Sequence, residues 1–271
     1  MTITRLTAVR TLSGPFDGEG RGGDCVSARD LGAVLNNPRF VRAPITLDKA
    51  WTRLLEQAVA IRAPIPVLLL WGKGPKEGPD GIDLCAVEFL CRYAAKVAAA
   101  WSPGVRFQVL FADTHAAING YRAEETDVYF TEMRGLLDSV TDEFGTLSEV
   151  WRRARRDWTT QIRLEAGLTD ESWQDVARSL GLVEAAKRHA RVGPPEAVAR
   201  RYYCLRRAEN QWLAEQYSEW AFATCESPER TVLLPALPVL HLYSWARGRC
   251  AKPWFTLEDD SSNSPLLPTV N

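Results

Sequence analysis

The chain has 271 residues, of which 46% are hydrophobic and 10% aromatic, and its formal net charge is −1. This composition predicts a folded protein with a packed core, and it excludes a protein that is basic overall. A nucleic-acid partner would therefore need positive charge gathered in one place. No apolar run is long enough to span a membrane, and the first residues lack the apolar core of a signal peptide. We therefore expect a cytoplasmic protein with no membrane partner.

Composition changes along the chain predict three parts. Residues 1–45 form an N-terminal segment with a Gly-rich loop at 12–24, where no helix or strand period is present. Residues 46–256 form a single catalytic domain. Residues 257–271 form an acidic tail rich in Ser and Pro, which we expect to be flexible.

The region from residue 46 to residue 140 alternates between helical and strand-like patterns. Apolar residues recur at helical spacing in 46–60, 79–104 and 122–140, whereas 64–74 and 106–113 contain continuous apolar runs typical of buried strands. This order predicts a βαβ crossover, and therefore an α/β fold with a parallel sheet flanked by helices.

The C-terminal half is predicted to be rich in helix. Helical patterns cover 147–167, 170–193 and 194–224, and a strand-like stretch at 231–248 is expected to return to the sheet.

Cysteine usage indicates neither a metal site nor a disulfide framework. The six cysteines are scattered and no Cys-x-x-Cys motif occurs. Cys85, Cys91 and Cys204 fit the pattern of small buried hydrophobes in helices. We expect no metal and no other cofactor.

Two loops of the predicted sheet follow strands and so lie where ligands of parallel sheets bind. The first, Gly72-Lys73-Gly74-Pro75-Lys76, is not a Walker A motif, because GxxxxGK[ST] is absent. Its glycines would let a ligand approach the backbone, and Lys73 and Lys76 would meet a phosphate or carboxylate. The alternative is an ordinary strand-exit turn with solvated lysines.

The second loop begins Asp113-Thr114-His115, with Asn119 a few residues on. Asp113 is suited to hold an ammonium group, and His115 to hydrogen-bond a ribose or phosphate or to move a proton. The alternative is structural, because Asp or Thr also caps the helix that follows and His115 would then be a half-buried spacer.

A compact arginine cluster lies in the predicted helix at 147–167 and consists of Arg152, Arg153, Arg155 and Arg156, with Arg163 further along. On one continuous helix Arg152, Arg156 and Arg163 would share a face. Such a concentration of positive charge favours an anionic partner, for example a phosphate backbone. The alternative is a solvated face neutralised by nearby acidic residues: Asp142, Glu143, Glu149 and Asp157.

A second cluster interleaves arginines with tyrosines in ARRYYCLRRAE. Tyr202 and Arg206 are four residues apart, as are Tyr203 and Arg207, so one pair can face a substrate pocket while the other faces solvent. Tyr243 lies on an alternating, strand-like stretch. It is a candidate pocket residue and, like His115, a candidate for moving a proton in catalysis, and a core position is the alternative.

The segment LFADTHAAINGYRAEETDVYFTEMRGLL resembles class I aminoacyl-tRNA synthetases of the tyrosyl/tryptophanyl branch. The matching residues are Ala112, Asp113, His115, Ala116 and Asn119. The resemblance implies a Rossmann-like core. The two adenylation signatures of that family, a His-x-Gly-His type stretch and a Lys-Met-Ser-Lys-Ser type loop, are absent, and Trp71-Gly72-Lys73-Gly74 stands in place of the first. Activation of an amino acid with ATP is therefore not expected.

The chain also resembles tRNA-dependent cyclodipeptide synthases, which keep this core without ATP chemistry. The resemblance implies that Arg152–Arg156 meet tRNA and that Tyr217 and Tyr243 line the aminoacyl pocket. It implies transfer of an aminoacyl group from aminoacyl-tRNA to an amine, giving a dipeptide or cyclodipeptide. Their Ser nucleophile is missing, because Gly72-Lys73-Gly74 replaces the Gly-x-Ser stretch, and Ala221 stands four residues after Tyr217 instead of Glu. Direct attack of the amine on the ester needs no protein nucleophile.

A second resemblance concerns isocyanide synthases of the dityrosine/paerucumarin type. They share the order of strand, lysine-bearing loop, long helix, Pro-Gly, strand and Asp-containing turn, although their turn reads Ser-Asp-Gly. This resemblance implies condensation of an amino acid with a sugar phosphate held by Lys73 and Lys76. A third alternative is a non-catalytic tRNA-binding homologue.

Overall fold

The computed structural model describes residues 26–72, 78–168, 172–225 and 232–243. The predicted Gly-rich loop at 12–24, the lysine loop from Lys73 to Lys76 and the predicted tail at 257–271 lie outside the described residues.

The predicted order of helix, strand, long helix, strand and helix is present as α2, β1, α3, β2 and α5, whereas the short helix α4 and the strand β3 were not predicted. The described elements are α1 (Ala28–Leu35), α2 (Lys49–Ile61), β1 (Ile65–Trp71), α3 (Gly81–Ala100), β2 (Val105–Phe111), α4 (Asp113–Ile118), α5 (Ala123–Leu137), β3 (Glu143–Thr146), α6 (Leu147–Arg153), α7 (Trp158–Leu168), α8 (Trp173–Ser179), α9 (Leu182–His189), α10 (Pro195–Gln216), β4 (Ala221–Thr224) and β5 (Val239–His241).

These strands form a five-stranded sheet in the order β3-β2-β1-β4-β5, and all neighbours are parallel. This is the doubly wound, Rossmann-like order, in which the chain crosses from one half of the sheet to the other beside β1. Val67 of β1 pairs with Phe107 of β2 on one side and with Ala221 of β4 on the other. The α/β fold with a parallel sheet flanked by helices is confirmed.

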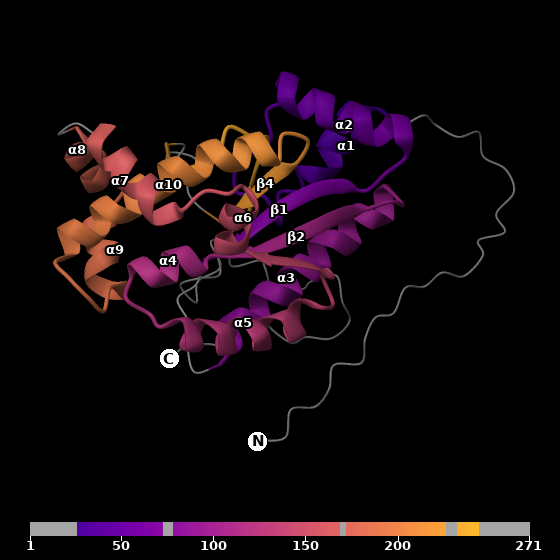
Figure 1. Cartoon of the computed structure of the whole chain (residues 1–271). Helices are drawn as coiled ribbons and strands as arrows, with labels where there is room; N and C mark the ends of the chain where they lie inside the picture. The colour runs from indigo at the N-terminus through magenta and orange to yellow at the C-terminus, as the bar shows by residue number, and fades with distance from the viewer. Residues whose placement is uncertain (1–25, 73–77, 169–171, 226–231, 244–271) are drawn as a thin grey trace, which may run out of the picture.

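The strands are buried on both faces, as their continuous apolar runs predict. On one face α1, α2, α3 and α5 pack against β1, and the cluster includes Leu31 and Leu35 of α1. Part of the predicted N-terminal segment 1–45 therefore packs on the sheet. On the other face α6 and α10 cover Leu68, Leu110 and Phe222. Figure 1 shows α7, α8 and α9 gathered around the first half of α10, at one end of the molecule.

Side-chain caps set the start of several helices. The carboxylate of Asp48 accepts hydrogen bonds from the first backbone N–H groups of α2, and Asp80 does the same for α3. These bonds satisfy donors that have no partner within the helix. The cap at Asp80 sets the start of α3, the long helix that the sequence predicts at 79–104.

The single helix predicted over 147–167 is wrong. Helix α6 ends at Arg153, and Arg155 adopts a left-handed backbone conformation with φ +54°. The carboxylate of Asp157 accepts hydrogen bonds from the backbone N–H groups of Thr159 and Thr160, so a new helix begins here. The chain therefore turns sharply through the arginine cluster.

The helices predicted at 170–193 and 194–224 are each wrong in part. The first is two helices, α8 and α9, separated at Gly181, whose φ of +64° suits a residue without Cβ. The second ends with α10 at Gln216, and its last residues form strand β4 instead. The predicted return of the chain to the sheet is confirmed by β5. None of the described helices has the length and apolar character needed to cross a membrane.

Candidate active site at the carboxyl edge of the sheet

Asp113 is the first residue of α4, directly beyond the carboxyl end of β2. Its Oδ1 atom accepts hydrogen bonds from the backbone N–H groups of Thr114 and Ser148, both at 3.0 Å. Ser148 belongs to the first turn of α6, which follows β3. One carboxylate therefore joins the elements that follow two neighbouring strands. Its Oδ2 atom accepts no hydrogen bond from the described residues.

A buried network forms where α4 meets α10, and its centre is Glu209. The carboxylate of Glu209 accepts from the Thr114 hydroxyl at 2.9 Å and lies 2.7 Å from Nε2 of His115. Arg206 donates to the same carboxylate at 3.3 Å and to the carbonyl oxygen of Leu233 at 2.6 Å. Glu209 is fully buried and His115 and Arg206 nearly so. The network therefore ties α4, α10 and the segment before β5 to one buried charge.

Glu209 is held as a carboxylate despite its burial. Burial alone would raise its pKa, but the contact with His115, the charge of Arg206 and the hydrogen bond from Thr114 outweigh this effect. The net result is a pKa below the ordinary value for Glu. A buried carboxylate that contacts Nε2 favours the imidazole tautomer with its proton on that atom.

The structure brings two more of the predicted site residues, Tyr202 and Asn119, to this network. The ring of Tyr202 meets the ring of His115 edge-on, with 5.3 Å between centroids. Asn119 donates from Nδ2 to the carbonyl oxygen of His115 at 3.0 Å and so closes the last turn of α4. Arg206, already part of the network, donates its hydrogen bonds to Glu209 and Leu233, so it holds the buried network together and does not point to a substrate.

A second buried chain of hydrogen bonds lies at the carboxyl end of β1. The indole N–H of Trp71 donates to the Tyr129 hydroxyl at 3.2 Å, and this hydroxyl donates to Asp83 at 3.1 Å. Burial is the main cause that raises the pKa of Tyr129. The next residue, Gly72, is exposed, and among the described residues an added Cβ would meet only Ala112, at 3.9 Å.

Four of the five predicted tRNA-binding arginines, Arg152, Arg153, Arg155 and Arg156, are exposed around the turn between α6 and α7. They do not share one helical face, because the helix breaks among them. No described residue forms an ion pair with Arg152, Arg153, Arg155, Arg156 or the exposed Arg163 of α7. Arg152 lies one helical turn beyond Ser148, about 6 Å along the axis, and Ser148 is hydrogen-bonded to Asp113. Arg152 is therefore within about one helical turn of the residue that contacts Asp113, whereas Arg153, the last residue of α6, lies near enough to Tyr217 for its charge to oppose the rise that burial causes in the pKa of Tyr217.

Tyr217 does not reach the carboxyl edge. It is the residue at which α10 ends, shortly before β4 begins at Ala221, so it lies beyond the amino ends of the strands. It packs half-buried against Trp212 and Trp220. The resemblance implies that Tyr217 lines the aminoacyl pocket, but Tyr217 lies at the opposite edge of the sheet from Asp113 and His115, because β4 adds to the sheet directly after it.

Tyr243 follows β5 and so lies at the carboxyl edge, but its side chain is buried in the core on the face that carries α1, α2 and α3. Its backbone N–H donates to the carbonyl oxygen of Phe40. Tyr243 is therefore outside the Glu209 network, and its core interpretation fits the structure better than the predicted role in catalysis.

Sequence reasoning missed Glu209 as a site residue. The available signal was its position on α10, where Leu205, Ala208 and Trp212 mark a buried stripe on which a carboxylate is unusual. Sequence reasoning also missed Asp83 of α3 and Tyr129 of α5, which are likewise polar residues at buried positions of helices. Within the described residues, no group of three His, Cys, Asp or Glu side chains is placed to hold a metal ion.

The fold and site thus define an α/β protein with a Rossmann-like core and a polar cluster at the carboxyl edge. No protein-family model and no curated protein sequence matches the chain. Among solved structures, the PvcA protein from Pseudomonas aeruginosa is similar, with 13% identity, coverage of 78% of this chain and 83% of that chain, and a TM-score of 0.51.

Two synthetases are also similar at lower TM-scores. A tyrosyl-tRNA synthetase from Archaeoglobus fulgidus has 15% identity, a TM-score of 0.46 and coverage of 79% of this chain and 64% of its own. A tryptophanyl-tRNA synthetase from Aeropyrum pernix has 15% identity, a TM-score of 0.40 and coverage of 71% of this chain and 51% of its own. At these identities the likeness concerns the fold alone. The chain has the Rossmann-like core that the synthetase resemblance implies.

Proposed function

We propose that this protein transfers an aminoacyl group from aminoacyl-tRNA to an amine, forming a dipeptide or cyclodipeptide without ATP. One observation carries the proposal. The backbone of Ser148 hydrogen-bonds Asp113, and Arg152, an exposed arginine that forms no ion pair with the described residues, follows Ser148 by one helical turn, which supports the proposal. An amino acid attached to a phosphate-rich carrier needs both features side by side.

In the proposed reaction, the amine nitrogen attacks the ester carbonyl carbon of aminoacyl-tRNA. The new C–N bond forms, the ester C–O bond breaks, and the terminal ribose hydroxyl of tRNA leaves with a proton. Because the ester is already activated, holding the two reactants in contact supplies much of the rate. No protein nucleophile takes part, in keeping with the missing Ser.

Each residue of the edge cluster has a role in this proposal. Asp113 receives the amino group of the bound amino acid through Oδ2. His115 accepts the proton from the attacking amine and returns it to the leaving ribose oxygen. Glu209 is a positioning residue, since its contact with Nε2 of His115 fixes the ring and leaves Nδ1 to act as the base.

The proposed partner of the arginine cluster is the phosphate backbone of the tRNA acceptor stem. Exposed guanidinium groups that form no ion pair within the described protein keep their charge available for phosphate. Their spread around a turn, rather than along one helix face, suits a curved backbone path better than a straight one.

The proposal is tested by product formation. The purified chain is incubated with a charged tRNA pool and, separately, with free amino acids and ATP, and dipeptides are measured by mass spectrometry. We expect product only with charged tRNA. Equal product from the second mixture would overturn the proposal. A gel shift with tRNA but no product would indicate a non-catalytic tRNA-binding homologue instead.

A second candidate is an isocyanide-synthase-like enzyme that condenses an amino acid with a sugar phosphate. The observation in its favour is the position of Tyr217 at the amino edge of the sheet. The cyclodipeptide synthase resemblance implies that Tyr217 lines the aminoacyl pocket, and this position does not support that role. Substitution of Arg152 and Arg156 by Gln separates the two. The substitution weakens a tRNA-dependent reaction and leaves a reaction of free amino acid and sugar phosphate nearly unchanged.

A further inference from the structure

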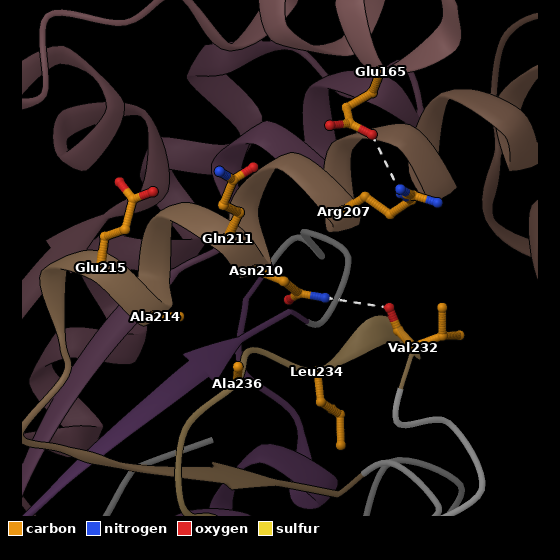
Figure 2. Close-up of a pocket in the computed structure, with 9 residues that line it drawn as sticks. All are labelled: Glu165, Arg207, Asn210, Gln211, Ala214, Glu215, Val232, Leu234 and Ala236. Carbon is orange, nitrogen blue, oxygen red and sulfur yellow. Dashed lines mark hydrogen bonds and ion pairs between the residues drawn. The ribbon is translucent and has the colours of Figure 1, made fainter. Parts of the chain in front are cut away.

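A groove of about 700 Å³ lies beside α10, and its size is typical of small-molecule sites. It is lined by residues from α7, α10 and the segment between β4 and β5, namely Glu165, Arg207, Asn210, Gln211, Ala214, Glu215, Val232, Leu234 and Ala236. None of the residues of the Glu209 network lines it. We call it the α10 groove, and Figure 2 shows its lining side chains.

Asn210 is the buried polar residue of the α10 groove, with only 7% of its surface exposed. In Figure 2 it extends from α10 toward Val232, to whose carbonyl oxygen Nδ2 donates at 3.5 Å, the outer limit of a hydrogen bond. Its Oδ1 atom is buried and accepts no hydrogen bond from the described residues. A buried acceptor without a donor is unfavourable, and such a group points to a missing partner.

The amide can turn to meet a partner. The terminal torsion of Asn is soft, and the bond that rotation would break is already long. A ligand with an N–H donor would therefore satisfy Oδ1 at little conformational expense.

The charges of the groove favour a positive ligand. The lining includes two carboxylates, Glu165 and Glu215, and one guanidinium, Arg207, so negative charge is in excess. Arg207 is already paired with Glu165 at 3.2 Å. The carboxylate of Glu215 is exposed at the other end of the groove. Between these ends Ala214, Leu234 and Ala236 offer an apolar wall for an aliphatic chain.

We infer that the α10 groove binds a small aliphatic amine in its ammonium form. The ammonium donates to Oδ1 of Asn210 and is attracted by the groove's carboxylates, and the alkyl chain lies on the apolar wall. This site is distinct from the Glu209 network and does not depend on the proposed aminoacyl transfer.

The test is a calorimetric titration of the full chain with n-pentylamine at neutral pH, with pentanoate as a probe of equal chain length and opposite charge. We expect a Kd on the order of 1 mM for the amine and no measurable binding of pentanoate. Asn210→Ala should weaken amine binding roughly tenfold, because a hydrogen bond to a charged group is removed. Glu215→Gln should weaken it roughly threefold.

The matched control is Glu56→Gln on the exposed face of α2, which removes the same charge away from the groove and should leave the Kd unchanged. Because Glu215 is exposed, its variant tests the site even if Asn210→Ala impairs folding. Equal binding of pentanoate, an unchanged Kd in Glu215→Gln, or no binding of the amine at concentrations roughly tenfold above the expected Kd would each overturn the inference.

Discussion

Nε2 of His115 and the carboxylate of Glu209 lie 2.7 Å apart, although 94 residues separate them in the chain. The pair joins the helix beyond β2 to the long helix before β4, and Arg206 and Thr114 complete its hydrogen bonds. A buried charge of this kind is tolerated only while its partners are in place. The contact therefore couples the stability of the fold to the candidate site.

Removal of the buried carboxylate should strongly destabilise the protein. We expect Glu209→Ala to lower the free energy of unfolding by about 3–5 kcal/mol, because Arg206 is left buried without its anionic partner. Urea unfolding measures the change. Glu215→Ala, on the exposed side of the same helix, should stay within about 0.5 kcal/mol of the wild type. Equal destabilisation of both variants would contradict the assigned burial.

The Glu209 network should also make stability depend on pH. The folded-state pKa of Glu209 is lowered, so the unfolded chain binds this proton more readily than the folded chain. Its contribution is therefore present above the ordinary pKa of Glu and is lost as pH falls through that range toward the folded-state value. Denaturant midpoints measured at neutral pH and in mild acid should differ less in Glu209→Gln than in the wild type. An identical pH dependence in both would show that Glu209 does not carry the effect.

The proposed proton transfer predicts a lower rate when His115 is replaced. His115→Gln should reduce the rate of aminoacyl transfer by about 10²–10⁴-fold, the usual contribution of a general acid–base residue. The rate is measured as dipeptide formed per minute from charged tRNA. His189→Gln is the matched control, because His189 lies exposed at the end of α9. An unimpaired His115→Gln protein would exclude His115 from the chemistry.

The arginine cluster should determine the salt dependence of tRNA binding. Removal of one arginine that binds a phosphate lowers the slope of log K against log salt by about 0.7–0.9. We therefore expect Arg152→Gln/Arg156→Gln to reduce the slope by roughly twice that amount. The control is Arg29→Gln/Lys49→Gln, which removes equal charge from exposed positions in α1 and α2. Filter binding over a range of salt concentrations gives both slopes, and equal slopes would argue against this surface.

The left-handed conformation of Arg155 gives a test of the turn itself. Glycine adopts φ near +54° without the steric penalty that other residues carry there. Arg155→Gly should therefore be roughly 1 kcal/mol more stable than Arg156→Gly, a variant of identical composition. Thermal unfolding of the two proteins compares them directly. A continuous helix through this region would make both variants equally destabilised.

Local patterns in the sequence were sufficient to predict many of the elements and the class of sheet. The apolar runs that became β1 and β2 and the helical stripes of α2, α3 and α5 each lie within one short segment, and such a pattern is enough to define an element. The position of Asp113 at the end of a buried strand followed in the same way. From that position alone, its place at the carboxyl edge of a parallel sheet was predictable.

Which distant residues meet depends on the three-dimensional arrangement alone. Tyr217 and Glu209 lie on or at the end of the same helix, yet only Glu209 meets His115, because β4 starts just after Tyr217 and fixes that end of α10 at the amino edge. The break between α6 and α7 likewise depends on Asp157, whose carboxylate caps the start of a new helix. The spacing of the arginines fits one continuous helix and so gave no sign of this break. Helical periodicity describes one element at a time. The contacts between elements depend on the order of strands in the sheet, and no local pattern contains that order.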